Sequence, residues 1–95
     1  MNKDILKKEL RNKLQKFIEQ SKIYKYIITN SSNNYSIQLT NKCTKDILLV
    51  KISDINISLV LANEYKNNTY NLNCSIDGKG IELYYFWLNL ILKTF

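Results

Sequence analysis

Residues 69–76, Thr-Tyr-Asn-Leu-Asn-Cys-Ser-Ile, decide the fold class of this chain. Every second position is apolar, and the positions between are Thr, Asn and Ser; the apolar set is Tyr70, Leu72, Cys74 and Ile76. Successive side chains of a β-strand point to opposite faces, so the pattern predicts a strand with the apolar set facing inward. Alternation this clean is typical of antiparallel sheets, which commonly leave one face in water.

The same period of two extends over the preceding part of the chain. Two alternating runs flank the Asn- and Ser-rich cluster 30–34, which predicts a hairpin. The apolar runs 46–52 and 55–62 follow, and only Ser53 and Asp54 separate them. These two runs form either a tight hairpin or one long strand with a bulge. We therefore expect a sheet of four to five strands.

Residues 3–22 have the pattern of an amphipathic helix. One apolar stripe recurs at spacings of four, four and three: Leu6, Leu10, Leu14 and Phe17. Asn2 or Asp4 can cap its start, because short polar side chains accept hydrogen bonds from the first free amides. The pattern leaves the end of this helix open between Gln20 and Tyr26.

The last segment fits two structures. Asp77 followed by Gly78 after a strand is a strong hairpin signal, which would make 81–88 a sixth strand. A helix is favoured over residues 80–93, with Asp77 as its cap, because the polar positions recur at the helical period: Glu82, Asn89 and Lys93.

These elements predict one domain over residues 1–95, of the α+β class. It would have an N-terminal amphipathic helix, an antiparallel sheet of four to five strands and a C-terminal apolar helix. No stretch is long and apolar enough to span a membrane, and the charged N-terminus has no secretory signal, so we expect a cytoplasmic protein.

The C-terminal helix is more apolar than a place on a sheet requires. Ten of the twelve residues from Ile81 to Leu92 are apolar, whereas such a helix needs an apolar arc of only about 100°. The surplus is either buried between the sheet and the first helix or forms an interface, in a homodimer or with another protein. Membrane docking is disfavoured because only Lys93 would supply a basic face. The candidate interface residues are Tyr84, Tyr85, Trp87, Leu88 and Ile91.

Positive charge is concentrated at the N-terminus. The net charge is +6, and residues 1–26 alone hold eight of the 14 basic and three of the eight acidic residues. This distribution fits three interpretations: a helix face that lies in water, contact with an acidic protein surface, or contact with a phosphate backbone. The candidate partner-binding residues on this basic face are Lys7, Lys8, Arg11 and Lys22.

Catalytic chemistry has little support in the composition. The chain has no His, so it has no imidazole base and no His metal ligand. Cys43 and Cys74 are expected to be free thiols in a reducing compartment, with one disulfide between them as the alternative. We expect no catalytic residues, no metal and no cofactor.

In size, A+T-biased composition and lack of catalytic residues, the chain resembles the accessory proteins that phages and mobile elements encode to block host defence, anti-CRISPR proteins among them. The resemblance includes no motif, so it assigns no residue a role. It implies a non-enzymatic module that binds another protein and inhibits it by occlusion. If the protein is viral, it would act in the cytoplasm of the host cell. The alternatives are a nucleic-acid-binding module that uses the basic helix and a self-associating structural subunit.

Overall fold

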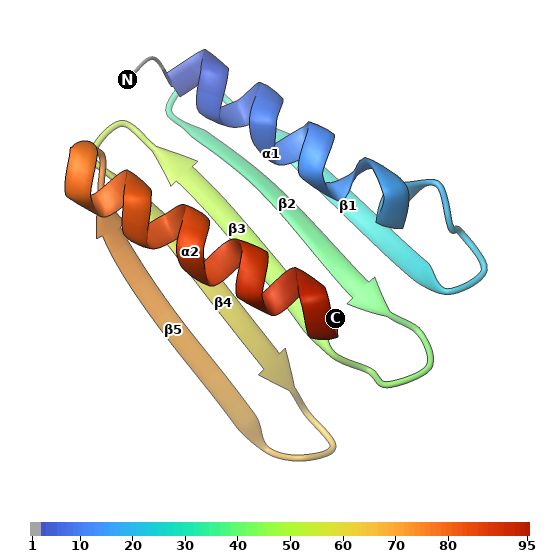
Figure 1. Cartoon of the computed structure of the whole chain (residues 1–95). Helices are drawn as coiled ribbons and strands as arrows, with labels where there is room; N and C mark the ends of the chain where they lie inside the picture. Colours follow the sequence, from blue (N-terminus) through green and yellow to red (C-terminus); the bar gives the residue numbers. More distant parts are fainter. Residues whose placement is uncertain (1–2) are drawn as a thin grey trace.

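Two helices lie side by side on one face of a five-stranded antiparallel sheet in the computed structural model (Figure 1). The structure describes residues 3–95. The predicted α+β class is confirmed. In chain order the elements are α1 (Lys3–Ile18), β1 (Tyr24–Asn30), β2 (Asn34–Asn41), β3 (Ile47–Ser53), β4 (Asn56–Asn63), β5 (Asn68–Ser75) and α2 (Gly78–Thr94).

The sheet is a meander in which each strand pairs with the next one along the chain, in the order β1-β2-β3-β4-β5. The runs 46–52 and 55–62 form the hairpin of β3 and β4, with Ile52 opposite Ile57. Strands β1 and β5 are consequently the two edges of the sheet, and each has only one neighbouring strand within residues 3–95.

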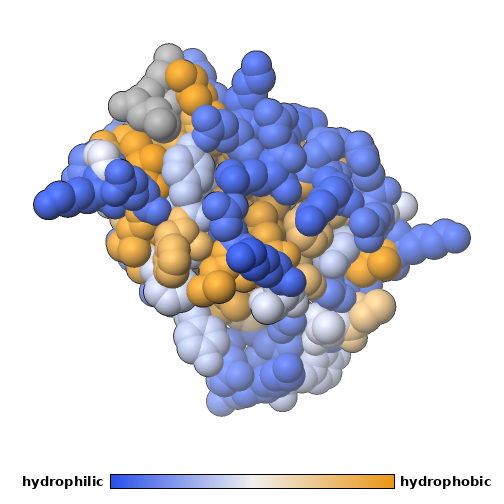
Figure 2. Space-filling view, in the orientation of Figure 1, coloured by the Kyte–Doolittle hydropathy of each residue, from blue (hydrophilic) through white to orange (hydrophobic). Residues whose placement is uncertain are grey.

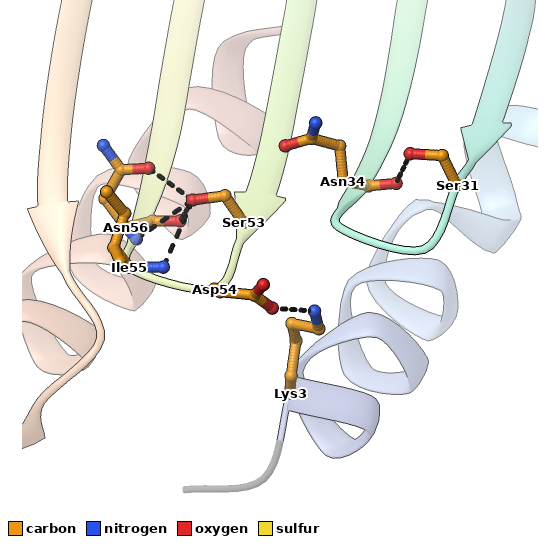
Figure 3. A network of polar contacts seen from close by, with 7 residues as sticks. All are labelled: Lys3, Ser31, Asn34, Ser53, Asp54, Ile55 and Asn56. Atoms are coloured by element: carbon orange, nitrogen blue, oxygen red, sulfur yellow. Dashed lines mark hydrogen bonds and ion pairs between the residues drawn. The ribbon is translucent and has the colours of Figure 1, made fainter.

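A serine builds the turn between β3 and β4. The Oγ of Ser53 accepts hydrogen bonds from the amides of Asn56 (3.1 Å) and Ile55 (3.4 Å), as Figure 3 shows. The next residue, Asp54, forms an ion pair with Lys3 at the start of α1. The first turn of α1 is thus held against this end of the sheet.

Two asparagines build the turns at the opposite end of the sheet. Asn41 ends β2 and Asn63 ends β4, and each Oδ1 accepts from two amides of the following turn: those of Cys43, Thr44, Tyr65 and Lys66. Four residues after each asparagine the backbone is left-handed, at Lys45 (φ 68°) and Asn67 (φ 52°). The Nδ2 of Asn63 also donates to the backbone oxygen of Thr44 (3.0 Å), which joins the two turns.

The core lies between the sheet and the two helices. The predicted stripe of α1, from Leu6 to Phe17, is buried. Helix α2 contributes Ile81, Tyr84 and Leu88. The buried apolar side chains of the strands complete this cluster: Tyr35, Ile37, Leu39, Leu48, Val50, Ile52, Ile57, Leu59 and Cys74.

The ends of the helices differ in part from the prediction. Helix α1 ends at Ile18 rather than at residue 22. The backbone oxygen of Gln20 accepts from the amides of Ile23 (3.0 Å) and Tyr24 (2.9 Å), which turns the chain into β1. Asn2, one of the two predicted caps, lies outside the described residues.

The C-terminal segment is a helix and not a sixth strand. Asp77 caps it as predicted, because its side chain accepts from the amide of Gly80 at 2.8 Å. Gly80 in turn lies so close to β5 that a Cβ atom placed on it would be 2.0 Å from the backbone oxygen of Ser75. The helix therefore starts in direct contact with the end of the strand that precedes it.

The alternation of β5 is as predicted, but its inward face is only partly covered. Cys74 is buried and Leu72 half-buried, whereas Tyr70 is 65% exposed. Tyr26, on the opposite edge strand, is 46% exposed. Strands lie about 4.8 Å apart and a helix is about 10 Å wide, so two helices cover roughly four strands. Tyr70 thus lies on the predicted inward face, in a groove beside Trp87 and Ile91, but the helices do not bury it.

Candidate functional site

A stripe of large apolar side chains runs along the outside of α2. Its members recur at the helical spacing of three and four and are 39–60% exposed: Leu83, Phe86, Trp87 and Leu90. Figure 2 shows apolar side chains gathered over α2. We call these four residues the α2 stripe. The opposite flank of the helix contacts α1, where Tyr85 donates to Glu9 and Lys13 donates to Asn89 at 3.0 Å.

The α2 stripe borders a groove between α2 and the adjacent strands. The groove has a volume of about 310 Å³ and is lined by Leu59, Leu61, Tyr70, Asn71, Leu72, Trp87 and Ile91. Its lining contains no charged side chain. Trp87 belongs both to the stripe and to the groove, so the two form one continuous apolar surface. Contiguous exposed apolar surface of this kind marks contact sites for proteins or apolar ligands.

Strand β5 forms the rim of this surface. As an edge strand it presents unpaired backbone amides and carbonyls on its outer side. Proteins usually protect such an edge with a charge, a proline or a bulge. The eight residues of β5, Asn-Thr-Tyr-Asn-Leu-Asn-Cys-Ser, include no charged residue and no proline. We call the α2 stripe, the groove and the β5 edge together the α2–β5 surface.

The predicted interface residues separate into three groups. Tyr84 and Leu88 are fully buried and belong to the core, so they are not available to a partner. Tyr85 is half-buried and faces α1. Trp87 and Ile91 line the groove and remain part of the candidate surface.

Sequence reasoning missed three stripe residues, Leu83, Phe86 and Leu90. The segment is apolar at nearly every position, so its pattern does not fix which side faces the core. The position of α1 settles this, because Tyr85 and Asn89 turn toward it. The spacing of the three residues with Trp87 would have revealed the stripe once that direction was known.

Two tyrosines of α2 have raised pKa values. Burial, followed by the nearby Tyr85 and Glu9, raises the pKa of Tyr84. Its hydroxyl has no hydrogen-bond partner among residues 3–95. Burial and the hydrogen bond to Glu9 raise the pKa of Tyr85 to about 12. Both phenols therefore stay neutral near pH 7.

The predicted basic face is not a single face. Lys8 and Arg11 are exposed on α1, and the Lys7 ammonium lies over the Tyr35 ring, 5.4 Å from its centroid. Lys22 falls in the turn after α1, because the helix ends four residues earlier. It therefore does not share a helical face with the other three.

The structure brings a different set of lysines together. Lys13 and Lys16 of α1 meet Lys93 of α2 around a shallow depression of about 470 Å³, whose lining also includes Asn89 and Leu92. No acidic side chain is part of that lining. The sequence did not reveal this lysine cluster because its members lie far apart in the chain and meet only through the packing of α1 beside α2.

Several features limit the chemistry of the described residues. Cys43 is exposed, Cys74 is buried, and both are free thiols, as predicted. Burial raises the pKa of the Cys74 thiol, which keeps it protonated. Within residues 3–95 no three Cys, Asp or Glu side chains come together in a way that could hold a metal ion. Neither described helix has the length and apolarity to cross a bilayer.

Comparisons with known proteins give no relative. No protein-family model, no curated protein and no solved structure matches this chain. The candidate sites are therefore the α2–β5 surface and the lysine cluster, both defined by the geometry of this chain alone.

Proposed function

We propose that this protein is a non-enzymatic binding protein that contacts a protein partner through the α2–β5 surface. The observation that carries the proposal is the α2 stripe, four large apolar side chains left 39–60% exposed on one side of a helix. Single exposed apolar residues are ordinary on protein surfaces, but a continuous set beside an apolar groove is not.

The chemistry of the surface favours a protein as the partner. Trp87, Phe86 and Tyr70 are side chains of the type that supplies most of the binding energy at the centre of protein interfaces. The uncharged edge of β5 can accept another strand, a common form of protein recognition. Phosphate-bearing ligands would instead require positive charge, which the groove lining does not provide.

We further propose that the protein acts by occlusion, covering a functional surface of its partner. A small domain without catalytic groups can inhibit a larger complex in this way. The resemblance in size and composition to phage and mobile-element inhibitors of host defence supports this role, as the free thiols support a cytoplasmic location.

Photocrosslinking from α2 tests this proposal for a partner of any identity. A benzophenone amino acid replaces Phe86 in one variant and Asn89 in a matched control, since both positions are exposed on the same helix. We expect irradiation of cells that express the protein to give a discrete crosslinked species from position 86 and much less from position 89. Equal crosslinking from the two positions, or none from either, would contradict the proposal.

The lysine cluster favours a second candidate function, contact with nucleic acid. Lys13, Lys16 and Lys93 line one shallow depression, and no acidic residue is part of that lining. Binding of this kind would weaken steeply with salt because it releases counterions. Charge reversal at Lys13 and Lys16 should abolish a gel shift with single- or double-stranded nucleic acid, while Lys66→Glu in the distant β4–β5 turn should not. Absence of any shift at low salt would exclude this candidate.

A further inference from the structure

We propose that a second copy of this chain occupies the α2–β5 surface, in a two-fold dimer that pairs β5 with β5 of the other copy. The inference rests on the proposed function to the extent that it assigns the same surface to protein contact. A second copy and a foreign partner would then compete for this surface. The two sheets would join into one continuous antiparallel sheet, with both α2 helices on the same side of it.

The first support is the character of the two sheet edges. Strand β1 carries Lys25, a type of residue that discourages pairing at an edge. Strand β5 has no charged residue, so a second β5 would bring no like charges opposite one another. Every strand pair in the sheet is already antiparallel, which is also the orientation that a two-fold axis between identical strands imposes.

The second support is the distribution of charge. A chain with a net charge of +6 repels its own copies, so self-association requires a surface free of that charge. The lining of the groove and the whole of β5 meet this condition.

The third support is geometric. Helix α2 contacts both β4 and β5, so its axis lies within about one strand spacing, ~4.8 Å, of the sheet edge. A two-fold axis beside β5 then places the two α2 helices about 10–15 Å apart. Helices pack at about 8–10 Å, and large side chains such as Phe86 and Trp87 fill wider separations. The second α2 would cover Tyr70, which the helices of one copy leave exposed.

The available area is also sufficient. Aromatic side chains bury about 150–250 Å² each, so the exposed parts of Tyr70, Phe86, Trp87 and the two stripe leucines amount to about 500 Å² per copy. The backbone and polar side chains of β5 add to this area. The total for two copies reaches the lower range of stable interfaces, about 1,200 Å².

Sedimentation velocity tests the dimer on the full chain. We expect the wild type to sediment with twice the 11.2 kDa mass of one chain at high micromolar concentration. Phe86→Lys and Leu90→Lys should each raise the dissociation constant at least tenfold, because a charge replaces an exposed apolar contact. The matched control Asn89→Lys, on the α1 side of the same helix, should leave it within twofold. Circular dichroism verifies that each variant is folded.

The outcomes separate this inference from the proposed function. A monomeric wild type at high concentration overturns the dimer, whatever the crosslinking shows. If position 86 then still crosslinks to a foreign protein, the proposed function stands without the dimer. If position 86 gives no crosslink either, both are wrong. Loss of the dimer in Asn89→Lys but not in Phe86→Lys would also overturn the inference, since it would place the contact on the other side of α2.

Discussion

Trp87 of α2 and Tyr70 of β5 line the same groove, and both large rings are left partly exposed, at 39% and 65%. The groove exists because the sheet has five strands and only two helices cover it. The edge strand β5, which carries no charge, is only partly covered, and Tyr70 is the residue left exposed. A fold of ordinary architecture thus leaves an apolar surface beside an unprotected sheet edge.

The fluorescence of Trp87 should report contact at this surface. Trp87 is the only tryptophan of the chain, so the emission comes from the α2 stripe alone. We expect the emission maximum to move to shorter wavelength as the protein concentration rises, because association removes water from the ring. The shift should disappear in Leu90→Lys and persist in Asn89→Lys. A maximum that is independent of concentration would show that Trp87 stays in water.

Replacing Gly80 by alanine should strongly destabilise the protein. The added methyl group would meet the backbone oxygen of Ser75, which cannot move aside as a flexible side chain could. We expect a loss of about 2–3 kcal/mol in the free energy of unfolding, measured with urea. Gly78→Ala is the matched control, because a methyl group there meets nothing within 4 Å. It should be neutral or stabilising by about 0.5 kcal/mol. Equal effects of the two substitutions would contradict the close contact at Gly80.

Removing the hydroxyl of Tyr84 should stabilise the protein. This buried group has no hydrogen-bond partner among the described residues, and leaving such a group unpaired costs about 1–3 kcal/mol. Tyr84→Phe is expected to raise the free energy of unfolding by about 1 kcal/mol. Tyr85→Phe removes the hydrogen bond to Glu9 and should lower it by about 0.5–1.5 kcal/mol. A destabilised Tyr84→Phe would show that the hydroxyl has a partner in solution.

The Asp77 cap predicts a specific dependence of stability on acid. The amide of Gly80 and then the hydroxyl of Ser75 lower the pKa of Asp77. A carboxyl group whose pKa is lower in the folded state stabilises the fold above its unfolded pKa, and this stabilisation is lost as the pH falls through the folded value. Between about pH 5 and pH 2.5, wild type should therefore lose more stability than Asp77→Asn, which has no charge to titrate. Parallel urea-unfolding curves for the two proteins over this range would contradict the role of the charged cap.

Much of the fold follows from local pattern. The alternation of residues 69–76 predicted the antiparallel sheet, and the stripe from Leu6 to Phe17 predicted α1. The polar positions Glu82, Asn89 and Lys93 predicted a helix where a hairpin signal competed. In each case a single periodicity determined the element, because residues that repeat at the period of a helix or strand share one face of it, the buried one in β5 and α1 and the exposed one in α2.

The functional surface could not be predicted in the same detail. Tyr84 and Phe86 are both aromatic residues of one apolar helix, yet Tyr84 is fully buried and Phe86 is 60% exposed. The difference depends on where α1 lies. The hydrogen bond of Tyr85 to Glu9 turns one side of α2 toward α1 and so sets which residues of α2 remain exposed. The meeting of Lys13 with Lys93 depends on the same packing. Such contacts join distant parts of the chain and leave no periodic signal in it.

Hydrogen exchange along β5, measured on the wild-type protein across a range of concentrations, tests the dimer most directly. Alternate amides of this strand point away from β4, and in a single copy they face water. If β5 pairs with a second β5, these outward amides should exchange slowly at high concentration and lose their protection on dilution, while the amides of β1 stay unchanged. Rapid exchange of the outward β5 amides at every concentration would contradict the dimer.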